Sequence, residues 1–149
     1  MRKILLVLIS IGVAASTVWA EPERDLSAIK VNLTDNASLL IADDQGQLTG
    51  VDPTIPKMYQ DIPESNGGDV PFTRAVSIFH PQGTAYQLIV IGMNRGDYAL
   101  EMVAYSQDGT PQPKITLRGD ASPGAKADYD ITFNRDWAGG DNASTMVRH

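Results

Sequence analysis

Short segments in which apolar and polar residues alternate recur along the chain, and they constrain its fold more than any other feature. The first of them places Ile29, Val31 and Leu33 on one side of an extended chain and polar neighbours on the other. A period of two with one apolar face is typical of a half-buried β-strand. Further segments of this kind lie at residues 39–41, 76–78, 86–90, 98–104, 115–117 and 129–133.

Turn sequences separate these segments. Gly46, Gly83, Gly96, Gly109 and Gly124 each lie in a short polar stretch, and glycine adopts the positive φ angles that many tight turns need. The strands recur about every 8–14 residues, which is the rhythm of an antiparallel sandwich or barrel. The sequence therefore predicts an all-β fold, an antiparallel Greek-key or immunoglobulin-like sandwich of about seven strands.

The composition of individual strands predicts their places in the sheets. Residues 85–92 are apolar on both faces, which favours a central strand, whereas the charges in 114–118 favour an edge. Short turns at 93–96 and 107–110 predict a meander of successive hairpins over residues 85–119. Prolines at 53, 56, 63 and 71 break residues 49–71 too often for a regular strand pair, so we expect a partly extended excursion there.

The chain divides into four predicted parts. Residues 1–20 read as a signal peptide, and residues 21–36 as an N-terminal segment that could supply an edge strand. Residues 37–135 form the predicted β-sandwich domain. Residues 136–149 contain two adjacent glycines and few apolar side chains, so we expect a flexible C-terminal tail.

The N-terminus has the layout of a secretory signal. Arg2 and Lys3 precede an apolar run, and small Ala20 stands directly before a polar, charged stretch. We expect a signal helix that is removed after Ala20, because the apolar run is too short for a permanent membrane span. The sequence therefore predicts a secreted or periplasmic protein without membrane insertion after signal removal.

Charge and cysteine content exclude several functions. The chain has 18 acidic and 12 basic residues, and its formal net charge is −6. An acidic domain repels phosphate backbones and anionic lipids, so we expect no nucleic-acid partner and no binding to membrane surfaces. The absence of cysteine excludes disulfides, thiol catalysis and thiolate metal sites.

Candidate catalytic residues are few. His149 is the last residue, so His80 is the one histidine placed to act as a general base, and no Gly-x-Ser-x-Gly motif is present. We therefore expect no enzyme. A small secreted hydrolase or inhibitor remains an alternative, and the proline-rich residues 53–71 are where an inhibitory loop would lie.

Three aspartates are candidate metal ligands. Asp43, Asp44 and Asp52 lie close together in the sequence, and calcium prefers several hard oxygen ligands from a loop. A calcium-stabilised extracellular β-domain is therefore one hypothesis, and no other cofactor is expected. The alternative is that these carboxylates cap their own turns, as aspartates commonly do.

Aromatic residues divide into two groups. Tyr86, Tyr98 and Tyr129 fall on predicted core-facing positions. Tyr59, Tyr105 and Trp137 are not committed to the core by the pattern, and exposed rings of this kind can stack on a ligand.

Three stretches resemble known secreted domains. Small secreted bacterial β-domains contain parts similar to residues 40–53, with the Thr49-Gly50-Val51-Asp52-Pro53 corner, and to residues 61–63. Residues 86–102 are similar to pre-peptidase and immunoglobulin-like accessory sandwiches attached to secreted hydrolases. The resemblance implies an accessory role and carries no site residues over. We therefore expect an exported, non-catalytic binding or accessory module that recognises a protein or peptide through a sheet edge or the proline-rich segment.

Overall fold

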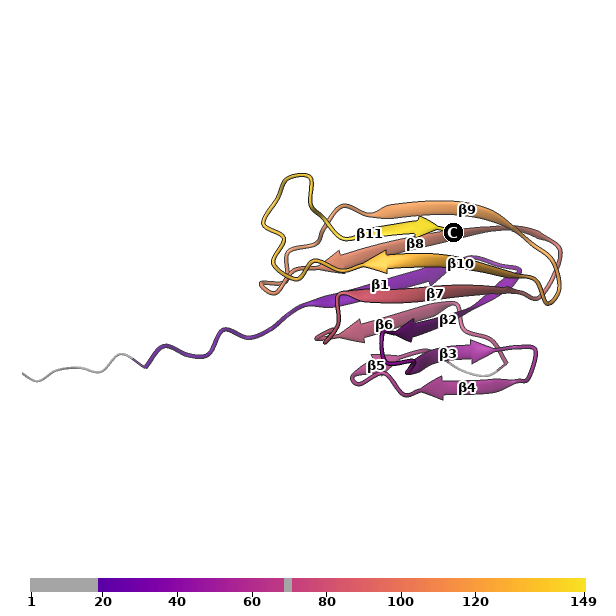
Figure 1. The fold of residues 1–149 in the computed structure, drawn as a ribbon, viewed down its shortest axis with the longest axis horizontal. Coiled ribbons are helices and arrows are strands. Elements are labelled where there is room, and N and C mark those ends of the chain that lie inside the picture. The colour runs from indigo at the N-terminus through magenta and orange to yellow at the C-terminus, as the bar shows by residue number, and fades with distance from the viewer. Residues whose placement is uncertain (1–18, 69–70) are drawn as a thin grey trace, which may run out of the picture.

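The computed structural model describes residues 19–68 and 71–149, which fold into two antiparallel sheets packed face to face (Figure 1). The first sheet has five strands in the order β5-β6-β1-β8-β9, and the second has six in the order β11-β10-β7-β2-β3-β4. The five-stranded sheet comprises β5 (Ser65–Asn66), β6 (Ala75–Phe79), β1 (Ala28–Leu33), β8 (Gly96–Tyr105) and β9 (Ile115–Ala121). The six-stranded sheet comprises β11 (Thr145–Arg148), β10 (Lys126–Thr132), β7 (Ala85–Gly92), β2 (Ala37–Asp43), β3 (Leu48–Asp52) and β4 (Lys57–Gln60).

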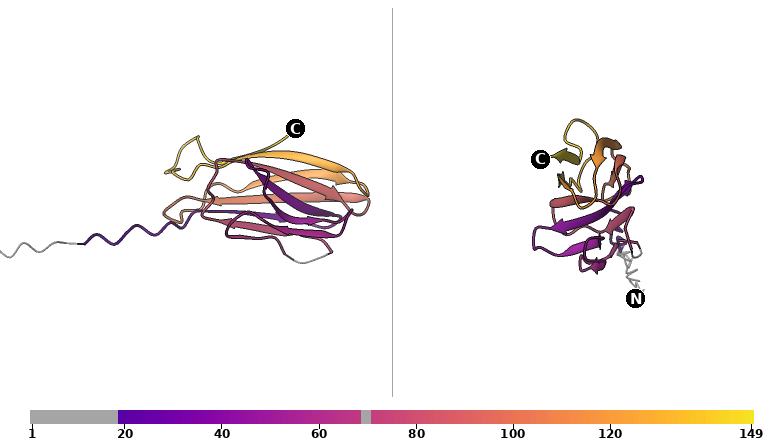
Figure 2. Two further views of the ribbon diagram at one scale, coloured as in Figure 1. Left: turned by 60° about the horizontal axis from the view of Figure 1, so that its bottom comes forward. Right: turned by 90° about the vertical axis from the view of Figure 1, so that its right-hand side faces the viewer.

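The prediction of an all-β antiparallel sandwich is confirmed, but the number of strands is larger than expected. Most of the predicted signal helix falls on residues 1–18, outside the described residues. Within the described part of the chain, no helix is long and apolar enough to span a membrane. The first described residues extend away from one end of the sandwich, as Figure 1 and the left view of Figure 2 show.

The core lies between the two sheets and is built from the alternating apolar residues. Both faces of the predicted pattern are visible in β1, where Ile29, Val31 and Leu33 are buried and Lys30 and Asn32 are exposed. The largest fully buried side chains include Tyr98, Tyr129, Ile29, Leu39, Ile41, Ile78, Leu88, Leu100, Met102 and Ile131. Burying this apolar area is the main source of stability, because the chain has no disulfide to restrict its unfolded state.

A polar contact between two tyrosines crosses this core. The hydroxyls of Tyr98 in β8 and Tyr129 in β10 form a buried hydrogen bond of 2.6 Å between the two sheets. Gly119 in β9 lies directly across from Tyr98, and a Cβ atom there would lie 2.4 Å from the Tyr98 hydroxyl oxygen. The missing side chain of Gly119 therefore leaves the space that the Tyr98 phenol occupies.

The positions of β7 and β9 in the sheets agree with the predictions, but the position of β1 does not. β7 lies between β10 and β2, and β9 is an outer strand, both as expected. β1 pairs with β6 on one side and β8 on the other, so the interpretation of residues 21–36 as a source of an edge strand is wrong. The alternation in β1 shows which face is buried, but it does not show how many neighbours a strand has.

The predicted meander over residues 85–119 is also corrected. β8 and β9 do form a hairpin, but β7 belongs to the other sheet. The turn after β7 passes from one sheet to the other, and there the carbonyl oxygen of Asn36 accepts hydrogen bonds from the backbone N–H groups of Met93 and Asn94. This short turn thus connects the two sheets and does not form a hairpin. Turn length alone does not distinguish these two cases.

The proline-rich segment contains more regular structure than predicted. β3 and β4 form an antiparallel pair inside it, because Pro53 and Pro56 fall in the connecting turn rather than in the strands. Buried hydroxyls join the rest of the segment to the sandwich. Thr49 and Ser65 share a hydrogen bond of 2.6 Å, and the Ser38 hydroxyl oxygen accepts the Thr73 backbone N–H at 2.8 Å.

The C-terminal residues are not simply a flexible tail. β11 pairs antiparallel with β10 and buries Met146 in the core. The backbone N–H of Ser144 donates to the side-chain oxygen of Gln112 at 2.7 Å, and the Ser144 hydroxyl accepts the backbone N–H of Asn134. One apolar side chain and one buried serine are enough to attach a segment whose composition predicts disorder.

Candidate functional site

The acidic turn between β2 and β3 uses its carboxylates to hold its own backbone. Asp43 accepts hydrogen bonds from the backbone N–H groups of Gln45 and Gln47 at 2.9 and 2.8 Å. Gly46 adopts a φ of 79°, as the tight turn requires. This arrangement is the capping role that the sequence offered as the alternative to calcium binding.

The third candidate ligand lies at the other end of the same strand pair. Because β2 and β3 run antiparallel, Asp43 ends β2 beside the start of β3, whereas Asp52 ends β3. Burial opposes ionisation of Asp52, but hydrogen bonds donated by Thr54 outweigh it and lower the pKa of this carboxyl below its usual value. Across the described residues, no three acidic or histidine side chains come together in a way that could hold a metal ion. The structure thus brings Asp43 and Asp44 together and leaves Asp52 apart.

Asp43 and Asp44 line a small recess of about 220 Å³ with Gly83 and Tyr86. The Tyr86 hydroxyl accepts the backbone N–H of Gly83 at 3.2 Å. Burial raises the pKa of Tyr86, and the negative charges of Asp43 and Asp44 raise it further. Tyr86 is thus a neutral packing residue at the edge of this recess, in agreement with its predicted place in the core.

His80 lies at the end of β6, where the backbone adopts an unusual conformation. Its φ is 47°, and that of its partner Glu64 is 54°, so both occupy the left-handed region that few side chains adopt. The His80 ring nitrogen Nδ1 contacts the Glu64 carboxylate, and this hydrogen bond raises the pKa of His80. A histidine paired with a carboxylate is half of a hydrolytic site, but the ring makes no hydrogen bond to a serine or threonine hydroxyl among the described residues.

A second charged contact fixes the N-terminal segment beside His80. The backbone N–H of Ser27 donates to the Asp25 carboxylate at 2.9 Å, and this hydrogen bonding lowers the pKa of Asp25. Arg135, 3.6 Å away, lowers it further. The Arg135 guanidinium also donates to the carbonyl oxygen of Pro81 at 2.6 Å. These contacts attach the chain before β1 to the end of the sandwich.

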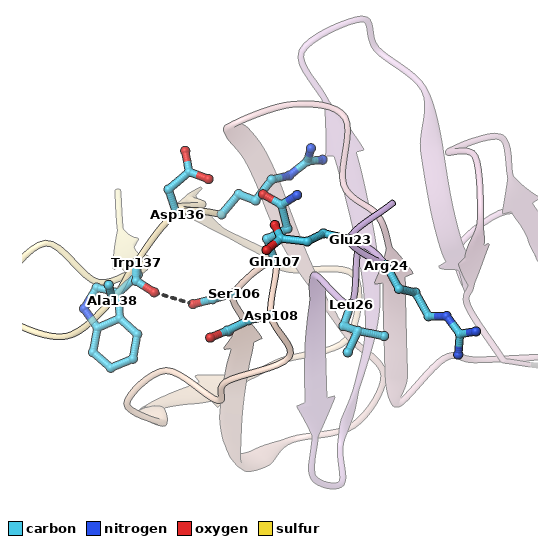
Figure 3. Close-up of a pocket in the computed structure, with 10 residues that line it drawn as sticks. Glu23, Arg24, Leu26, Ser106, Gln107, Asp108, Asp136, Trp137 and Ala138 are labelled. Atoms are coloured by element: carbon cyan, nitrogen blue, oxygen red, sulfur yellow. Dashed lines mark hydrogen bonds between the residues drawn. The ribbon is translucent and has the colours of Figure 1, made fainter. Parts of the chain in front are cut away.

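A recess beside these contacts has a volume of about 490 Å³ (Figure 3). Trp137 and Ala138 line one side of it, and Glu23, Arg24 and Leu26 line the other. The Ser106 hydroxyl donates to the carbonyl oxygen of Trp137 at 2.8 Å, which holds the C-terminal loop against the β8–β9 turn. The lining mixes charged and apolar groups and presents no nucleophile paired with a base.

The proline-rich segment supplies an outer strand. β4 is the last strand of the six-stranded sheet, and β5, the last strand of the facing sheet, has just two residues. Met58 lies directly across from buried Val51, so it shares the inner face with it, yet 46% of Met58 is exposed. The inner face of β4 is therefore incompletely covered by the opposite sheet.

The backbone of β4 is also available at this edge. The Asp61 N–H donates to the Leu48 carbonyl at 2.8 Å, which identifies that pair as hydrogen-bonded. In an antiparallel ladder, hydrogen-bonded and non-hydrogen-bonded pairs alternate, so the N–H and C=O groups of Met58 and Gln60 point away from β3. Sequence reasoning named this segment but missed Met58. The proline-free stretch 57–62 between Pro56 and Pro63 was the signal that could have identified the strand.

Comparison with known proteins finds no match to a family model, a curated protein or a solved structure. The structure confirms a two-sheet antiparallel β-sandwich, and no family is identified.

Proposed function

We propose that this protein is an exported, non-catalytic binding module that accepts an extended segment of a partner protein or peptide as an additional strand beside β4. As part of this proposal, the β-sandwich is of the immunoglobulin-like or Greek-key accessory type that the sequence predicts. The observation that carries it is that the proline-rich segment and a free sheet edge, the two alternatives left open by the sequence, are the same place in the fold.

The side chains around this edge favour a particular partner. Met58 is 46% exposed and Ile55, in the adjoining turn, is 58% exposed, so both offer apolar surface. The Lys57 ammonium lies 4.5 Å from the centroid of the Tyr59 ring. We therefore expect an extended partner segment with an apolar side chain against Met58 and a carboxylate near Lys57. Backbone hydrogen bonds would supply affinity and these side chains specificity.

The other outer strands are less suitable. β9 carries exposed Arg118 and Asp120, and charges on an edge discourage strand addition. At β11, the C-terminal His149 forms an ion pair with Asp130 at 2.6 Å, which holds the end of the chain beside β10. β4 thus combines outward backbone groups with the exposed apolar side chain of Met58, and Lys57 is its one charged residue.

The test is a selection of random twelve-residue peptides on the purified protein, followed by titration of the selected peptides into three variants. Met58→Pro removes an outward N–H without breaking a hydrogen bond to β3, whereas Met58→Leu keeps both the N–H and the apolar side chain. Val147→Thr, at the other end of the same sheet, is the matched control. We expect Met58→Pro to weaken binding at least about tenfold, because it removes a backbone hydrogen bond and apolar contacts.

Met58→Leu and Val147→Thr should bind the selected peptides as the unmodified protein does. Amide hydrogen exchange should slow at Met58 and Gln60 when the peptide binds. Equal affinity for Met58→Pro, or protection located at β9 or β11, would contradict the proposal.

A further inference from the structure

A second candidate site lies on the outer face of the five-stranded sheet and is independent of the β4 edge. In register, Ala28 of β1 lies between Phe79 of β6 and Tyr105 of β8. The small side chain of Ala28 between two large rings makes a slot, with Ala28 as the floor and the rings as walls. We name these three residues the outer slot. They line a recess of about 370 Å³.

The dimensions of the outer slot suit one flat ring. β6 and β8 are separated by two strand spacings, roughly 10 Å, which is about twice the distance at which aromatic rings pack against each other. Phe79 is 42% exposed, although aromatic side chains contribute most to stability when buried. The walls therefore offer apolar surface that the protein itself leaves open to solvent.

The Lys30 side chain covers Ala28 and places its ammonium between the two rings. The Lys30 ammonium lies 5.2 Å from the centroid of the Tyr105 ring and 6.0 Å from that of Phe79. The ion pairs found within residues 19–68 and 71–149 do not include Lys30. In an acidic protein with net charge −6, a lysine that has aromatic neighbours and no carboxylate partner marks a local site for an anion.

Two acidic groups on this side of the molecule already have partners. Glu101, on the same face of β8, pairs with Lys114 at 3.2 Å, and Glu64 contacts His80 at the rim of the recess. Neither carboxylate is bound to Lys30. An incoming anion can thus reach the ammonium without displacing an internal partner.

From these observations we infer that the outer slot and Lys30 bind a small organic anion with a flat, apolar ring, such as an aromatic carboxylate. The ring would replace the Lys30 ammonium between Phe79 and Tyr105, and the Lys30 side chain would move outward and donate a charge-assisted hydrogen bond to the carboxylate. This site would use Tyr105, one of the aromatic residues that the sequence left uncommitted to the core.

The experiment titrates 2-naphthoate into the purified protein and follows backbone amide shifts by NMR. The amides of Ala28, Lys30 and Tyr105 should shift saturably. Lys30→Met keeps the length of the side chain but removes the charge, and we expect at least about tenfold weaker binding. Ala28→Leu fills the floor of the slot and should abolish binding, while Lys114→Met on the same sheet should change affinity by less than about twofold.

A second probe separates charge recognition from general ring binding. 2-Naphthylmethylammonium has the same ring system with the opposite charge, so Lys30 should repel it. The inference is overturned if 2-naphthoate produces no saturable shift, if Lys30→Met binds it as tightly as the unmodified protein, or if the cation binds equally well. Because Lys30→Met changes an exposed residue, this comparison holds even if Ala28→Leu fails to fold.

Discussion

Two pairs of aromatic residues, each with one member on β8, have opposite environments. Tyr98 and Tyr129 meet between the sheets, are 2% and 1% exposed, and satisfy each other with a hydrogen bond of 2.6 Å. Phe79 and Tyr105 stand on the outer face, separated by Ala28 and close to the Lys30 ammonium. Tyr98 and Tyr105 both belong to β8, seven positions apart, so strand alternation alone places them on opposite faces.

The comparison shows that aromatic side chains have two different roles in this small domain. The inner pair fills space and joins the two layers, so its removal should affect folding. The outer pair leaves a recess open, so its removal should affect ligand binding rather than folding. A core residue and a site residue are thus distinguished by what surrounds the ring, since the residue type is the same.

The largest expected effect is the loss of stability on truncating the inner pair. Tyr129→Ala should lower the free energy of unfolding by about 3–5 kcal/mol, because it leaves a cavity and an unpartnered Tyr98 hydroxyl. Tyr105→Ala should cost about 1 kcal/mol or less, because its ring is half-exposed. Urea unfolding monitored by circular dichroism measures both values. Similar costs for the two variants would show that the outer slot is part of the structural core.

A smaller effect isolates the hydrogen bond between the sheets. Tyr98→Phe keeps the ring but leaves the Tyr129 hydroxyl buried without its partner, which should cost about 1–3 kcal/mol. The double variant with Tyr129→Phe should cost less than the sum of the two single changes, because it removes both polar groups together. Additive costs in the same urea experiment would mean that the two hydroxyls do not depend on each other.

The sequence predicts the inner pair better than the outer one for a physical reason. Alternation with period two reports which face of a strand is buried, and it correctly places Tyr86, Tyr98 and Tyr129 inside. It does not report lateral neighbours, so it could not reveal that Phe79, Ala28 and Tyr105 lie in one row. That row depends on the register of three strands that are far apart in the sequence.

The same limit explains the errors in topology. The position of β1 in the middle of its sheet and the passage of β7 to β8 between layers both depend on long-range pairing. The prolines of residues 53–71 do mark turns, but β4 forms between two of them and becomes the proposed binding edge. Local signals therefore predict the strands and the fold class, whereas the candidate sites arise from how the strands are assembled.

The smallest expected effect separates the two regions by their response to pH. Burial, and then the hydrogen bond with Tyr129, raises the pKa of Tyr98, so Tyr98 stays neutral throughout the neutral range. At the rim of the outer slot, the Glu64 carboxylate raises the pKa of His80 above 6.5. A histidine with a raised folded-state pKa contributes its full stability below about pH 6.5 and loses it as pH rises through the folded pKa.

The unmodified protein should therefore melt slightly higher than Glu64→Gln at pH 5.5, and this difference should shrink by pH 8.5. Because the pair is exposed and screened by solvent, we expect a change on the order of one degree, measured by thermal unfolding. Asp25 also faces His80, with Arg135 beside it, and keeps its charge across this window because hydrogen bonding from Ser27 lowers its pKa. Asp108→Asn is the matched control. Hydrogen bonds from Thr110 lower the Asp108 pKa, so its contribution should be constant between these two pH values. A pH-dependent difference as large in Asp108→Asn as in Glu64→Gln would remove His80 as the source and place the titration elsewhere in the fold.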